Sequence, residues 1–71
     1  MAKAMKVVEF FIDNNWVLHD QFVDEIDTYE NLKARKAKKD QLSFINGVMV
    51  EINTIRHLGN EAIVKTTTTW I

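Results

Sequence analysis

Apolar residues occupy most positions from Lys6 to Ile12, and the polar residues 13–15 follow directly. The apolar residues of this segment are β-branched or aromatic, the types that are enriched in strands. They fall at both odd and even positions, which is typical of a strand covered on two sides. The pattern therefore predicts a strand from Lys6 to Ile12 and a turn at residues 13–15.

The spacing of apolar residues becomes helical between about Asp20 and Lys38. Acidic residues crowd the first half of this stretch and basic residues the second half, an order that complements the helix macrodipole. The stretch therefore predicts an amphipathic helix. Its apolar stripe, with intervals of three or four positions, consists of Phe22, Ile26, Tyr29 and Leu32.

A second interpretation of the same stretch stays open. A hairpin can continue through Trp16, Leu18 and Phe22 after a turn at residues 14–15. The helix would then start late, near Asp27, with a strand before it. The sequence alone does not choose between the two starts.

Strand-like alternation follows in the last part of the chain. The pair Asn46-Gly47 is a strong hairpin signal, because a type I′ turn needs positive φ at both central residues. Residues 57–60 form a second turn signal. The predicted strands are Gln41 to Ile45, Val48 to Arg56 and Glu61 to Ile71.

These elements predict an α+β fold in a single compact domain that spans residues 1–71. The expected order is roughly β-α-β-β-β, a small antiparallel meander of three to five strands with one amphipathic helix packed on a face. No linker or internal repeat divides the chain.

The composition limits how such a chain can be stabilised. It has 71 residues and no cysteine, so a disulfide framework is excluded. Because a single core of this size supplies only about 3–5 kcal/mol, oligomerisation is expected. The threonine-rich last strand carries one lysine near its middle and little else against pairing at a sheet edge. We therefore expect a homodimer through the edge of that strand, with Thr67 and Thr69 as contact residues.

The two tryptophans are the other candidates for partner binding. Trp16 and Trp70 have the side chain that is enriched in interface hot spots. In so small a chain a tryptophan also commonly forms the centre of the core. Trp70 stands one residue from the end of the sequence, where cores usually thin out.

A basic segment provides the alternative hypothesis of nucleic-acid binding. Its positive charges could neutralise phosphates, but no aromatic residue is interleaved for stacking on bases. A solvated helix end, stabilised by the macrodipole, explains the same pattern. The segment comprises Lys33, Arg35, Lys36, Lys38 and Lys39.

Catalytic and metal chemistry find little support in the sequence. His19 and His57 are the two histidines, and neither has a second histidine at helical spacing. Ser43 is the one serine and lacks the glycine-flanked elbow of a nucleophile. We therefore expect no enzyme activity, no metal and no cofactor. The longest uncharged stretch, residues 41–50, is too short to span a membrane, so a cytoplasmic location is expected.

Two function classes follow from these observations. The first is a non-catalytic interaction module that binds another protein, such as an inhibitor or accessory regulator. Small chains of this kind are commonly encoded by bacteriophages or mobile elements. The alternative is an RNA- or DNA-binding accessory protein that uses the basic segment. Salt dependence separates the two, because phosphate contacts weaken steeply as salt rises.

Overall fold

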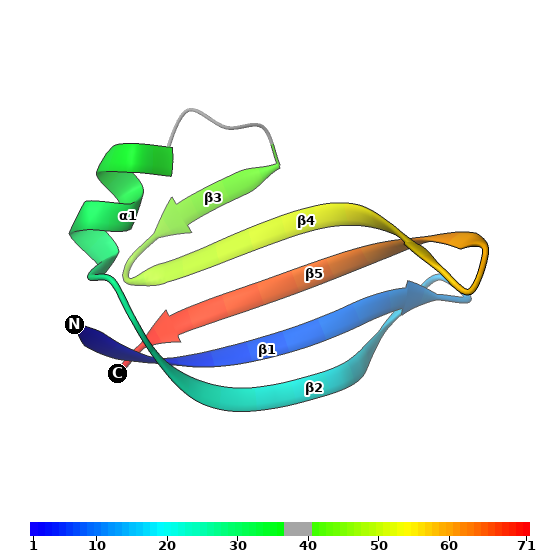
Figure 1. Ribbon diagram of the computed structural model, residues 1–71, viewed down its shortest axis with the longest axis horizontal. Helices are drawn as coiled ribbons and strands as arrows, with labels where there is room; N and C mark the ends of the chain where they lie inside the picture. The colour runs from blue at the N-terminus through cyan, green and yellow to red at the C-terminus, as the bar shows by residue number, and fades with distance from the viewer. Residues whose placement is uncertain (37–40) are drawn as a thin grey trace.

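The computed structural model describes residues 1–36 and 41–71, and of His57 it describes the backbone alone. These residues form one antiparallel five-stranded sheet and one short helix (Figure 1). The α+β class and the antiparallel sheet agree with the sequence prediction. The elements are β1 (Ala2–Ile12), β2 (Asn15–Ile26), α1 (Tyr29–Lys36), β3 (Leu42–Ile45), β4 (Val48–His57) and β5 (Asn60–Trp70).

The sheet joins the two ends of the chain. Its strand order is β2-β1-β5-β4-β3, so the first and last strands are neighbours in the middle. The pairing of β1 with β5 runs from Ala4 and Trp70 to Phe10 and Val64. The amide of Ile71 also donates to the carbonyl of residue 3 at 3.0 Å, which holds the two termini together.

Two-residue turns connect the strands of all three hairpins. The predicted turn at Asn46-Gly47 is confirmed, with φ values of 50° and 77°. Leu58 and Gly59 between β4 and β5 also have positive φ, at 51° and 81°. Such turns match the twist of the strands that they join. Local turn chemistry thus fixes where each hairpin reverses.

The predicted helix over about 20–38 is wrong in its first half. Residues 15–26 form β2, which pairs with β1 along its length, so the order is β-β-α-β-β-β rather than β-α-β-β-β. The apolar stripe is divided, because Phe22 and Ile26 belong to the strand and Tyr29 and Leu32 to the helix. The alternative with a hairpin and a late helix start describes the structure. Pairing with β1 overrides the local helical pattern.

Side-chain caps set the start of α1. The Thr28 hydroxyl accepts a hydrogen bond from the amide of Asn31 at 3.2 Å. The Asp27 carboxylate accepts hydrogen bonds from the Thr28 amide at 2.8 Å and from the Asn31 side chain at 3.1 Å. It also forms an ion pair with Arg35 at 3.2 Å. These groups satisfy free amides of the first helical turn, so the helix begins directly after them.

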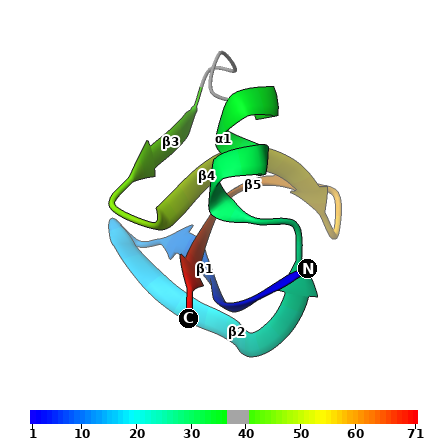
Figure 2. The same cartoon turned by 90° about the vertical axis from the view of Figure 1, so that its left-hand side faces the viewer.

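The sheet buries side chains on the face that carries α1. Strand alternation and register place Ala4, Met49, Val64 and Thr68 on this face, and all four are buried. We call it the inner face and the opposite one the outer face. Figure 2 shows the sheet curling toward α1 on the inner side. The core is therefore small and lies within this curl.

The start of α1 contacts one end of the inner face, and packing of the whole helix on a face, as the sequence predicts, is not confirmed. The Tyr29 ring lies edge-on against Trp70, with ring centroids 5.4 Å apart, and against Phe44, at 5.8 Å. The Trp70 indole N–H donates to the carbonyl of Asp27 at 3.0 Å. Leu32 is the buried residue of α1. This end also holds both termini, and the hairpin turns at residues 13–14 and 58–59 lie at the other end (Figure 1).

The buried hydroxyl of Thr68 generates a stability prediction. The residue is fully buried, and its hydroxyl oxygen has no hydrogen-bond partner within the described residues. Burying an unpaired polar group is unfavourable. We expect Thr68→Val to raise the free energy of unfolding by about 1 kcal/mol in urea titration. The matched change Thr69→Val, on the exposed outer face, should alter it by less than about 0.5 kcal/mol. A destabilised Thr68→Val variant would contradict the prediction.

The cap at Asp27 predicts a dependence of stability on pH. The pKa of the Asp27 carboxyl lies below 3.8, because the Asn31 side chain, the Thr28 amide and Arg35 favour its charged form. A lowered folded-state pKa stabilises the protein above the unfolded value, and this stabilisation is lost as pH falls through the folded-state value. Asp27→Asn should therefore be less stable than the wild type at pH 6. The difference in free energy of unfolding between the wild type and Asp27→Asn should decrease below about pH 4 in urea titrations. A difference that stays constant with pH would contradict the prediction.

Candidate functional site

An apolar cleft opens where β1 and β5 part. Their pairing ends at Phe10 and Val64, but β1 continues to Ile12 and β5 starts at Asn60. The two hairpin tips enclose a hollow of about 510 Å³ beyond this point. We call this hollow the tip cleft. It is lined by Phe10, Phe11, Ile12, Leu58, Asn60, Glu61, Ala62 and Ile63.

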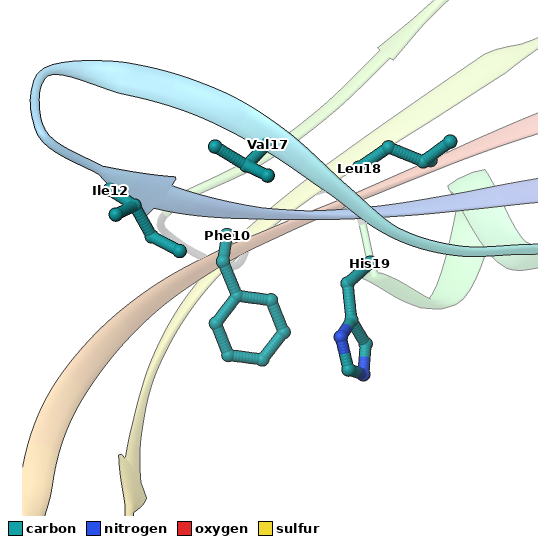
Figure 3. Close-up of a pocket in the computed structure, with 5 residues that line it drawn as sticks. All are labelled: Phe10, Ile12, Val17, Leu18 and His19. Atoms are coloured by element: carbon teal, nitrogen blue, oxygen red, sulfur yellow. The ribbon is translucent and has the colours of Figure 1, made fainter.

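A second, smaller hollow adjoins the tip cleft on the β2 side. It has a volume of about 200 Å³ and shares Phe10 and Ile12 with the cleft (Figure 3). A β-bulge shapes this hollow, because Val8 pairs with Asp20 and the next residue pairs with Leu18. His19 is the extra residue, and its ring lies 4.7 Å from that of Phe10. The bulge thus turns a polar ring toward an apolar wall.

Exposed apolar side chains concentrate at this end of the molecule. Seven of the twelve exposed large apolar residues within the described ranges lie on the two hairpin tips. Exposed apolar residues that gather at one end of a soluble protein are candidates for an interaction surface. We call these seven residues the tip patch: Phe11, Ile12, Val17, Leu18, Ile55, Leu58 and Ile63.

Leu58 is the least expected member of the tip patch. It occupies the first turn position of the β4–β5 hairpin with φ of 51°, and 89% of its surface is exposed. A left-handed backbone at a residue other than glycine or asparagine is unfavourable by about 1–2 kcal/mol. The side chain gains no burial in return. Strain together with apolar exposure is typical of a residue that serves binding rather than stability.

A polar cluster on the outer face borders the tip patch. The Lys65 ammonium lies 4.4 Å from the centre of the Trp16 ring and 3.6 Å from a Glu9 carboxylate oxygen. The Trp16 ring also contacts that of Phe11, with centroids 5.0 Å apart. Trp16 is half-buried here. The cluster joins the tip patch to the outer face and pairs the charges of Glu9 and Lys65.

The predicted partner-binding residues occupy different parts of the fold. Trp16 borders the tip patch, whereas Trp70 lies at the far end beneath α1 with its N–H already bonded. Thr67 and Thr69 lie on the outer face of β5. The expectation that β5 presents a free edge is wrong, because β5 pairs with β1 on one side and β4 on the other. Contacts of Thr67 and Thr69 with a partner stay a prediction.

The basic segment lies at the opposite end from the tip cleft. Lys33, Arg35 and Lys36 belong to α1, while Lys38 and Lys39 lie outside the described residues. Arg35 is paired with the helix cap, and the Lys33 ammonium lies 5.8 Å from the centre of the Tyr29 ring. Two of the three described cations therefore already interact with neighbouring side chains.

Comparison with known proteins gives no information on function, so the tip cleft is the main structural basis for a hypothesis. No family model, curated protein or solved structure matches the chain. In the described ranges, no helix has the length and apolar content to cross a membrane. Nor do three acidic, histidine or cysteine side chains gather there as metal ligands.

Sequence reasoning identified Trp16, which borders the tip patch, but missed the seven residues of the patch itself. Ile12 and Ile63 are far apart in the chain, and only the sheet register brings them to one cleft. One signal for Leu58 was available, because residues 57–60 already form a predicted turn. A large apolar residue in such a turn is unusual and marks the position for attention.

Leu58 generates a prediction that separates stability from binding. Leu58→Asn should raise the free energy of unfolding by about 0.5–1 kcal/mol in urea titration, because asparagine tolerates positive φ. The variant tests whether the leucine is retained for packing. A loss of stability in Leu58→Asn would show that Leu58 supports the fold, and would contradict its assignment to a binding surface.

Proposed function

We propose that this protein is a non-catalytic interaction module that binds another protein through the tip patch. The concentration of exposed apolar side chains around the tip cleft carries the proposal. Covering such a surface releases water from apolar groups, which is the main driving force of protein association. An inhibitor or accessory regulator fits this mode of action, because it acts by occupying a surface.

The arrangement of the tip also favours a partner that meets a rigid surface. The patch residues belong to strands and tight turns, and the sheet pairing continues to Phe10 and Val64 at the base of the cleft. Sites on strands hold their side chains more accurately than sites on long loops. The tip therefore offers a preformed surface, and little ordering cost opposes binding.

Binding of RNA or DNA by the basic segment is the second candidate. The exposed Lys33 and Arg35 on α1 favour it, although both have partners within the chain. The tip end carries the acids Asp13 and Glu61, whose charges oppose phosphate, together with the cation Arg56. Nucleic acid would therefore find more positive charge on α1 than at the tip patch. Origin in a phage or mobile element, a cytoplasmic location and a homodimer stay predictions.

The proposal predicts which variants lose their partner. Immobilised wild-type protein should retain a specific host protein, identified by mass spectrometry, after nuclease treatment and a high-salt wash. The double variant Leu58→Asn, Ile63→Thr should lose that protein, because it removes two members of the tip patch. Val23→Thr is the matched control, since Val23 is exposed on β2 far from the tip.

Two outcomes would contradict this function. Equal retention of the same protein by the tip variant would remove the tip patch from the interaction. Nuclease-sensitive capture that falls steeply with salt would instead favour nucleic-acid binding by the basic segment.

A further inference from the structure

The tip cleft has an apolar interior and an acidic lip. Phe10, Ile12 and Ile63 face the hollow from both hairpins, whereas Glu61 lines it as a charged residue. Asp13 follows Ile12 directly in the neighbouring turn and is exposed. Glu61 forms no ion pair within the described residues, unlike Glu9, which is paired with Lys65.

The position of Glu61 leaves its charge open to a partner. Arg56 stands opposite Glu61 in the β4–β5 register, but the two side chains do not come within ion-pair distance. The carboxylate is exposed at the mouth of the cleft. An opposite charge arriving with a ligand would therefore gain a pairing that the chain itself does not supply.

The unpaired carboxylate of Glu61 at the cleft indicates the chemistry of its occupant. A protein segment that combines an apolar side chain with a cation fits both the interior and the lip.

We infer that the tip cleft binds a partner segment in which a large apolar side chain stands next to a lysine or arginine. The apolar side chain fills the hollow between the hairpin tips, and the cation pairs with Glu61. This inference rests on the proposed function and specifies its partner. Recognition by one buried apolar anchor with a charged neighbour is a common arrangement of interface hot spots.

Matched dipeptides test this inference on the intact chain. N-acetyl-Arg-Phe-amide and N-acetyl-Glu-Phe-amide share the apolar side chain and differ in charge. Titration followed by NMR should give saturable shifts of the Ile63 and Leu58 methyl groups with the arginine dipeptide. The glutamate dipeptide should bind about threefold more weakly, the size expected for an exposed charge pair. Glu61→Gln should remove this difference while leaving the fold unchanged.

Several results would overturn the inference. They are the absence of saturable shifts at the cleft, equal affinity for both dipeptides, or a charge preference that survives in Glu61→Gln. Methyl shifts that depend on protein concentration alone would assign the cleft to a second copy. Co-sedimentation with phosphatidylglycerol vesicles, lost in Leu58→Asn, would assign it to a membrane surface.

The dipeptide titration and the capture experiment test the inference and the proposed function independently. If the dipeptides do not bind but the tip variant still loses its protein partner, the charge-and-anchor inference is wrong and the proposed function stands. If the tip variant keeps its partner and the arginine dipeptide still binds with its charge preference, the cleft recognises this chemistry without being the main interface.

Discussion

The pairing of β1 with β5 is the contact on which the rest of the structure depends. It joins the first hairpin to the last one across almost the whole chain, from Ala4–Trp70 to Phe10–Val64. An isolated two-stranded hairpin is at best marginally stable in water. By joining the two hairpins, this seam creates a sheet wide enough to curl around α1 and bury Ala4 and Thr68. The same seam creates the tip cleft by ending before the strands do.

Burial and exposure are divided between the two ends of the molecule. The end with α1 contains the ring contacts of Tyr29 with Trp70 and Phe44 and the capped helix start. The tip end exposes apolar residues and holds Leu58 in a strained turn. Stability at one end thus leaves the other end able to keep exposed apolar side chains.

Local signals in the sequence predicted a large part of the fold. Turn chemistry at Asn46-Gly47 and alternation in the last two strands gave correct elements, because both depend on near neighbours. Residues 15–26 misled the prediction. Their apolar spacing and charge order suit a helix, yet pairing with β1 makes them a strand. The cap formed by Asp27 and Thr28 was the local mark of the true helix start.

The candidate site was harder to predict, because it depends on register rather than on motif. Ile12 and Ile63 share a cleft only because Phe10 and Val64 are the last partners of the central seam. Which strand lies at an edge of the sheet is equally hard to predict from local sequence. The composition of β5 resembles that of an exposed strand, yet this strand lies in the middle of the sheet.

The closeness of the two termini has a consequence for how the protein can be joined to others. Ile71 is bonded to the backbone of Lys3, at the pole opposite the hairpin tips. A domain fused at either end would point away from the cleft and leave access to it open. The same geometry would allow a circular permutant, in which a short linker joins the two termini and new termini are placed in the Asn46-Gly47 turn.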